Sequence, residues 1–187
     1  MKSKVLALIL LCGAASLGAK VKLPALVGDN MILQQQTEVK LWGTAAPEAE
    51  VRVTPSWNGQ TMTCRADKDG GWTLAVETPA AGYTPYEITF DDGEKTTLKN
   101  ILIGEVWLAS GQSNMEMPLK GFAGCCIMNG ADDIIVSAEN KGVRMFTVPK
   151  HQTYELQTDC KGSWNISSIE TAPDFSATAY YFATSLS

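Results

Sequence analysis

The chain has 187 residues, enough for one domain or two small ones, and its 45% hydrophobic and 19% charged residues are typical of a folded, soluble protein. Its formal net charge is −5, and no basic residues cluster along the sequence. Because an acidic surface repels phosphate backbones, this balance argues against nucleic acid as a partner.

Residues 1–19 have the order of charged, apolar and small residues that is typical of a secretory signal peptide. Lys2 and Lys4 precede the apolar run 5–11, which is too short to span a bilayer. The rest of the sequence contains no apolar stretch long enough to cross a membrane. We therefore expect a secreted or periplasmic protein whose mature chain begins near Lys20.

The cysteines lead to further expectations. Cys12 lies where a lipoprotein would be modified, but the bulky Leu11 before it makes a lipid anchor the less favoured alternative. A secreted chain can form disulfides, and the mature part contains four cysteines: Cys64, Cys125, Cys126 and Cys160. We expect Cys160 to pair with Cys125 or Cys126, with free, buried thiols as the alternative. With one histidine and no CxxC pair in the sequence, we expect no metal site.

From Val21 to about Asn100 the sequence is typical of β structure. Runs with alternating or β-branched residues recur between turn formers, and they predict strands at 31–33, 38–43, 50–54, 60–65, 72–77 and 86–90. Short strands at this spacing predict a small β-sandwich domain over residues 20–100. Residues 67–70, with the sequence DKDG, could begin a calcium loop, but the later ligands are missing, so we expect a hairpin turn.

After Asn100 the pattern becomes that of an α/β fold. The nearly continuous apolar stretch 101–109 predicts a central strand that is buried on both faces of a parallel sheet. The elements expected next are a helix at about 131–139, a strand at 143–148, and a helix at 175–186 with Asp174 as its N-cap. This alternation predicts the start of an α/β domain with a parallel sheet over residues 101–187.

The predicted strand 101–109 leads into a turn that contains a serine, Gly111-Gln112-Ser113-Asn114. A serine hydroxyl is a weak nucleophile, and it needs a base for its proton and hydrogen-bond donors for the oxyanion that forms. A sharp turn between a strand and a helix exposes the hydroxyl and points backbone N–H groups at the reacting centre. Gly111 would permit the tight turn, and Ser113 would supply the hydroxyl and one oxyanion donor. A capped loop after a strand is the competing interpretation of these four residues.

A longer block around this turn is more specific. Residues 104–119, with the sequence GEVWLASGQSNMEMPL, closely resemble the nucleophile block of the sialate O-acetylesterase family, which belongs to the SGNH (GDSL-like) hydrolases. Other blocks resemble the same family in the family order: GDNMILQ at 28–34, WG at 42–43, DGGW at 69–72, RMFTV at 144–148 and FSATAYYF at 175–182. The resemblance covers nearly the whole mature chain.

The resemblance implies a two-part α+β chain, in which the β-sandwich precedes the N-terminal portion of an α/β/α, flavodoxin-like SGNH hydrolase domain. It also implies an activity, because members of the family remove O-acetyl groups from sugars, notably from sialic acids, without a metal or other cofactor. The family serine attacks the acetyl carbonyl and forms an acyl-enzyme that water hydrolyses, and this role carries over to Ser113. Gly111, Gln112 and Asn114 match positions that flank the serine and are candidates for shaping the site and its oxyanion hole.

The chain departs from the family in its base. In the family, the catalytic histidine and an aspartate shortly before it lie near the far end of the hydrolase domain, and the chain has no such block. Its one histidine, His151, follows the predicted strand 143–148 in a polar segment, and Val148 stands three residues before it. We therefore expect His151 to be a solvated loop residue, and the chain to be a truncated front part of an esterase that is inactive alone.

Two other functions stay open from the sequence. Trp42, Trp57 and Trp72 could stack on sugar rings, which would make the β-sandwich a non-catalytic sugar-binding or interaction module, although packing in the core is the preferred interpretation. A chain without independent function, produced from an interrupted gene, is the third hypothesis. The triplet at 165–167, NIS, fits a glycosylation acceptor, which a periplasmic protein would not use.

Overall fold

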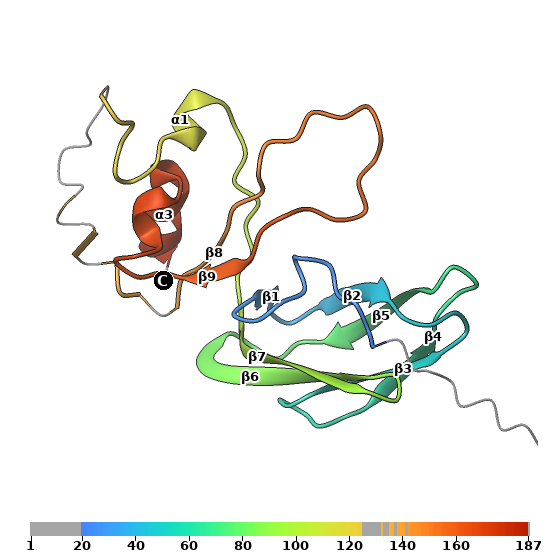
Figure 1. Cartoon of the computed structure of the whole chain (residues 1–187). Helices are drawn as coiled ribbons and strands as arrows, with labels where there is room; N and C mark the ends of the chain where they lie inside the picture. The colour runs from blue at the N-terminus through green and yellow to red at the C-terminus, as the bar shows by residue number, and fades with distance from the viewer. Residues whose placement is uncertain (1–19, 125–131, 133–134, 137, 141, 187) are drawn as a thin grey trace, which may run out of the picture.

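The computed structural model describes residues 20–124, 132, 135–136, 138–140 and 142–186. The first half of the chain forms two β-sheets, which are together called the β-layer. The second half forms a smaller part in which a helix packs against a short strand pair (Figure 1). The predicted signal peptide, with Cys12, lies outside the described residues. None of the helices in the described ranges has the length and apolar character needed to cross a membrane.

The strands of the first half follow its alternation of β-branched and turn-forming residues. Their bounds are β1 (Ile32–Gln34), β2 (Glu38–Thr44), β3 (Glu50–Pro55), β4 (Met62–Arg65), β5 (Gly71–Glu77), β6 (Gly82–Asp91) and β7 (Lys95–Gly104). One sheet has the order β1-β7-β6-β3-β4, and β2 pairs with β5 in a second sheet. These pairs are antiparallel except β1 with β7, which is parallel. The six strands predicted up to residue 90 are therefore confirmed, with shifted ends.

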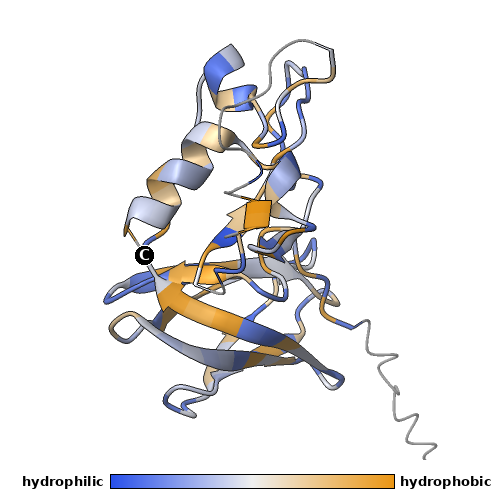
Figure 2. Ribbon diagram, turned by 90° about the vertical axis from the view of Figure 1, so that its left-hand side faces the viewer, coloured by the Kyte–Doolittle hydropathy of each residue, from blue (hydrophilic) through white to orange (hydrophobic). Residues whose placement is uncertain are grey.

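Both sheets contribute side chains to one hydrophobic core. Along β3, Val51 and Val53 point inward while the residues between and before them are exposed, which is the period of two expected of a strand. Leu41 from β2 packs in the same cluster, and the ring of Phe90 from β6 lies 5.8 Å from the ring of Trp72 from β5. Figure 2 shows the hydrophobic stretches along the strands of this layer.

Residues 67–70 form a tight turn, as expected, but not a hairpin. The carboxylate of Asp67 accepts the N–H groups of Asp69 at 2.9 Å and of Gly71 at 2.7 Å, so it is used by the turn itself. Gly70 has a φ of +86°, a conformation that glycine adopts without strain. Since β4 and β5 belong to different sheets, the turn carries the chain from one sheet to the other.

Two of the three tryptophans pack against the core, which confirms the preferred interpretation for them. Trp72 is 5% exposed, and the ring of Trp57 meets that of Tyr86 edge-on at 5.7 Å. The indole N–H of Trp57 also donates to the carbonyl of Glu77 at 2.9 Å. Trp42 is 37% exposed, so it is the member of the three with its ring at the surface.

The predicted strand 101–109 is wrong in its extent and in its partners. β7 ends at Gly104, pairs antiparallel with β6 and parallel with β1, and thereby completes the N-terminal layer. Residues 105–112 are in no strand, and Leu108 is 92% exposed. An extended segment becomes a strand only where a neighbour pairs with its backbone, and the described residues supply no such neighbour beyond Gly104.

The second half of the chain packs around its own small core. Its elements are α1 (Ser113–Glu116), β8 (Arg144–Phe146), β9 (Trp164–Ile166), the 3-10 helix η1 (Ala172–Asp174) and α3 (Ala177–Leu186). Leu119, Met145 of β8 and Tyr180 of α3 are buried together. The expected parallel sheet is not formed by the described residues, because β8 pairs antiparallel with β9, and the ring of Phe146 packs on that of Trp164 at 5.4 Å. Of the predicted helix at about 131–139, residues 132, 135 and 136 are helical, residues 138 and 139 are not, and the other four lie outside the described residues.

Asp174 is not the N-cap of α3, contrary to expectation. Pro173 directs the chain into η1, and the carboxylate of Asp174 pairs with the ammonium group of Lys120. Ser176 takes the capping role instead, because its Oγ accepts the N–H of Ala179 at 3.3 Å.

Ser176→Ala is expected to lower the free energy of unfolding by about 1 kcal/mol, the usual cost of losing a capping hydroxyl. Asp174→Ala removes an exposed ion pair and is expected to cost less than about 0.5 kcal/mol. Urea unfolding of both variants and the parent chain measures the difference. Equal losses in the two variants would contradict the assignment of the cap.

The expected disulfide of Cys160 is not formed. Cys160 and Cys64 are free thiols, and Cys125 and Cys126 lie outside the described residues. A disulfide needs two Cα atoms within about 7 Å of each other, which sequence spacing alone does not establish. Burial raises the pKa of the Cys64 thiol, which favours its protonated form.

Candidate functional site

Ser113 is the first residue of the short helix α1, which follows segment 105–112, a stretch in no helix or strand. The carbonyl of Gln112 accepts the N–H of Met115 at 2.9 Å, which closes the turn. A Cβ atom at Gly111 would lie 3.1 Å from the Cβ of Met115, closer than most such contacts. Gly111, two residues before the serine, therefore lets the chain turn tightly, as the sequence predicts.

The serine turn is exposed, and several of its hydrogen-bonding groups are unpaired among the described residues. Residues 111–114 are all exposed. The first N–H groups of a helix have no partner within the helix, and those of Ser113 and Asn114 donate to no acceptor in the described part of the chain. The Oγ of Ser113 likewise has no hydrogen-bond partner there. The hydroxyl and two free N–H groups thus lie within one short turn, as an attacking serine and an oxyanion require.

The start of α3 holds this turn in place. The N–H of Ala177 donates to the carbonyl of Met117 at 2.8 Å, and the hydroxyl of Thr178 donates to the carbonyl of Asn114 at 3.1 Å. The Oγ of Ser176 lies 3.4 Å from the sulfur of Met115. This attachment was not predicted from the sequence. Two hydroxyl residues near the start of the predicted helix, Ser176 and Thr178, are the feature of the sequence that could have indicated it.

Among the described residues, no histidine or carboxylate side chain is hydrogen-bonded to Ser113. His151 is exposed in the segment between β8 and β9, so the expectation of a solvated loop histidine is confirmed. Its neighbour Lys150 pairs with Glu116 of α1 at 2.7 Å, which ties this segment to the helix. His151 itself forms no hydrogen bond with the part of the chain that the structure describes.

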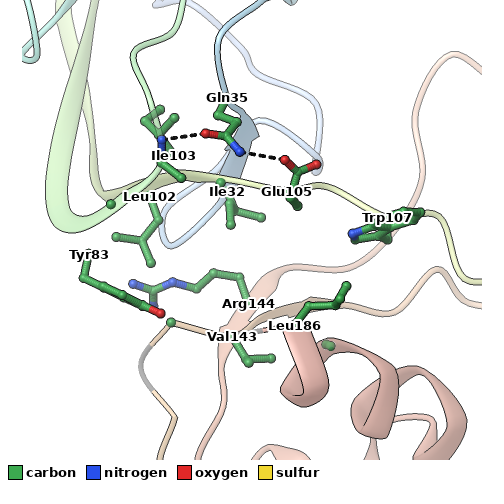
Figure 3. Close-up of a pocket in the computed structure, with 15 residues that line it drawn as sticks. Ile32, Gln35, Tyr83, Leu102, Ile103, Glu105, Trp107, Val143, Arg144 and Leu186 are labelled. Atoms are coloured by element: carbon green, nitrogen blue, oxygen red, sulfur yellow. Dashed lines mark hydrogen bonds between the residues drawn. The ribbon is translucent and has the colours of Figure 1, made fainter.

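A cavity of about 360 Å³ lies between the five-stranded sheet and the second half of the chain (Figure 3). Residues of β1, β6 and β7 line one side, and Val143, Arg144 and Leu186 line the other. Ser113 is not among the lining residues, although Trp107, in the segment that leads to it, is. The cavity and the serine turn are therefore distinct features.

Two charged residues line this cavity, and neither was predicted as a site residue. The amides of Gln34 and Gln35 donate to the carboxylate of Glu105 at 3.0 and 2.7 Å, and these hydrogen bonds lower the pKa of Glu105. Nη2 of Arg144 donates to Oδ1 of Asn100 at 3.1 Å, and burial lowers the pKa of Arg144. Within the described ranges, no group of three or more His, Cys, Asp or Glu residues is arranged to hold a metal ion.

By sequence, this chain is similar to proteins named sialate O-acetylesterase. The sialate O-acetylesterase of Rattus norvegicus is 27% identical over 175 residues, which are 86% of this chain and 31% of the relative. The sialate O-acetylesterase of Homo sapiens is 29% identical over 161 residues, 80% of this chain and 29% of the relative. No protein-family model matches the sequence.

A solved structure agrees with these relatives. The crystal structure of a carbohydrate acetylesterase from Xanthomonas citri matches this chain with a TM-score of 0.80 and 32% sequence identity. The resemblance to the sialate O-acetylesterases is confirmed. The match covers 89% of this chain and 37% of that structure, so the mixed α/β fold is close to that of part of a carbohydrate acetylesterase. The chain spans less than a third of the length of these curated relatives.

Proposed function

We propose that this chain is the serine-bearing part of a carbohydrate O-acetylesterase that hydrolyses O-acetyl esters on sugars, sialic acids among them. The single observation that carries the proposal is the exposed Ser113, in a tight turn with two free N–H groups, in a chain related to enzymes named sialate O-acetylesterase. The proposed substrate is an O-acetylated sugar, and the proposed reaction needs no cofactor.

In the proposed mechanism, Oγ of Ser113 attacks the acetyl carbonyl carbon while a base takes the hydroxyl proton. The negative charge on the carbonyl oxygen is stabilised by the N–H groups of Ser113 and Asn114. The tetrahedral intermediate then breaks its bond to the sugar oxygen, which leaves with the proton, and the acetyl group stays on Ser113. Water, activated by the same base, attacks this ester and releases acetate. Gly111 and Gln112 shape the turn.

The base is proposed to come from polypeptide outside these 187 residues. His151 is exposed and bonded to no described residue, and the chain spans about a third of the relatives. We further propose that the β-layer is a sandwich domain, residues 20–100, and that residues 101–187 begin an SGNH hydrolase domain. The exposed apolar segment that includes Trp107 and Leu108 supports this proposal, since it is suited to pair with further strands.

Residues 1–19 are proposed to direct the chain to the periplasm or the cell exterior as a cleaved signal peptide. The order of positively charged, apolar and then small residues in this segment supports the proposal, and the bulky Leu11 favours it over a lipid anchor on Cys12. Mass spectrometry of the secreted protein measures the mature N-terminus, and a start near Lys20 is the expected result.

The chain alone is expected to hydrolyse 4-nitrophenyl acetate no faster than its Ser113→Ala variant does. Without a base the serine loses a contribution of typically about 10²- to 10⁴-fold. A spectrophotometric assay at micromolar enzyme measures the difference. Rapid turnover that Ser113→Ala abolishes would overturn the proposal that the base lies outside the chain, and it would support Ser113 as the nucleophile.

A further inference from the structure

Arg144 brings a positive charge to the cavity beside α3 without a described counter-charge (Figure 3). Its Nη2 donates to Oδ1 of Asn100 at 3.1 Å, which is a neutral amide oxygen. Its Nε and Nη1 are buried and have no hydrogen-bond partner in the part of the chain that the structure describes. Burying a charged group without partners is costly, so buried guanidinium groups in proteins are normally paired.

Glu105, the other charged group of the cavity, forms no ion pair with Arg144. Both oxygens of Glu105 accept hydrogen bonds from Gln34 and Gln35, and no ion pair of the described residues includes Arg144. The pKa of Arg144 is lowered by burial, the direction expected of a cation whose lost hydration is not compensated. Arg144 therefore has no carboxylate within ion-pair distance among the described residues, although Glu105 adds a negative charge elsewhere on the cavity wall.

The walls of the cavity suit a small organic anion. A volume of about 360 Å³ lies within the range of small-molecule sites. Much of the lining is apolar: Ile32, Leu102, Ile103, Val143 and Leu186. The ring of Tyr83 lies beside the guanidinium group in Figure 3 and is 73% exposed, in a part of β6 where the pairing with β7 is irregular. Because Nε and Nη1 of Arg144 are buried, a ligand reaches them only when the side chains that cover them move.

We propose that this cavity binds a carboxylate-bearing molecule of the size of an acidic sugar, with the guanidinium group of Arg144 donating to the carboxylate oxygens. A guanidinium group pairs with a carboxylate through charge-assisted hydrogen bonds, which are the strong ones in proteins. Because Ser113 does not line the cavity, binding is expected whether or not the serine is catalytic.

D-Glucuronate and D-glucose are matched probes, since they share a ring and differ in the carboxylate. Isothermal titration calorimetry of the chain is expected to detect glucuronate binding and no glucose binding. In ¹⁵N–¹H spectra, the Nε–Hε signal of Arg144 is expected to shift as glucuronate is added. Raising the sodium chloride concentration is expected to weaken binding, because salt screens the charge pair.

Variants separate Arg144 from a general charge effect. Arg144→Gln is expected to weaken glucuronate binding by about tenfold or more, and Arg144→Lys by less. Arg65→Gln is the matched control, because Arg65 is exposed and pairs with Glu48, and it is expected to bind as the parent chain does. Asn100→Asp places a carboxylate beside Arg144 and is expected to weaken binding as Arg144→Gln does.

Circular dichroism establishes that each variant is folded. Equal binding of the two sugars, full binding by Arg144→Gln, or no binding of glucuronate at millimolar concentration would overturn the proposal. If Arg144→Gln does not fold, the NMR titration of the parent chain tests the proposal. An Nε–Hε signal of Arg144 that does not shift under saturating glucuronate would also overturn the proposal.

Discussion

Ser113→Ala is expected to lower the rate of acetyl ester hydrolysis by about 10³-fold or more in a protein in which further polypeptide completes the hydrolase domain that this chain begins. The substitution removes the atom that forms the covalent bond to the acetyl group, and the N–H groups of the turn can then only polarise the substrate. The measurement is kcat with 4-nitrophenyl acetate and with an O-acetylated sialic acid.

Ser110→Ala is the matched control for this prediction. Ser110 is also an exposed serine of the segment before α1, but the proposed mechanism gives it no role, so its variant is expected to keep kcat within about twofold. Mass spectrometry of a quenched reaction is expected to find the acetyl group on Ser113. An Ser113→Ala variant that keeps more than about a tenth of kcat would show that another residue is the nucleophile.

Phe90→Ala is expected to lower the free energy of unfolding by about 3–5 kcal/mol, the range for removing a buried aromatic ring. Phe90 is fully buried in the cluster that both sheets share, and its ring packs against Trp72. The cavity left behind cannot collapse easily, because strands pair on both sides of β6. Denaturant unfolding followed by tryptophan fluorescence measures the loss.

Tyr83→Ala controls for the loss of an aromatic ring from the same strand. Tyr83 lies in β6 but is 73% exposed, so its removal is expected to cost less than about 0.5 kcal/mol. Similar losses in the two variants would contradict the assignment of Phe90 to a rigid core.

The strands of the first half could be predicted because their signals are local. In β3, the alternation of valine with polar residues shows which side chains point inward, and Asp67 makes its own turn with neighbouring N–H groups. The tight turn at Gly111 was predictable for the same reason. Each of these features depends on residues a few positions apart, which the sequence displays directly.

Features that depend on distant partners were predicted poorly. The apolar stretch 101–109 is divided at Gly104, where pairing with β1 and β6 ends. Asp174 has the side chain of an N-cap, yet it faces Lys120, which is far away in sequence. The unpaired nitrogens of Arg144 follow from the placement of β8 opposite Asn100, for which the sequence carries no local signal.

By itself, the sequence determined the strand pattern of the first half, the serine turn at 111–114 and the resemblance to sialate O-acetylesterases. Only the tertiary structure decided that residues 105–112 are exposed and in no strand, that α3 holds the serine turn, and that a cavity with Arg144 lies between the two halves. The physical reason is that a strand ends where its hydrogen-bonding partners end, and a charge is left unpaired where the surrounding fold supplies no counter-charge. Both depend on residues that the chain brings together only by folding.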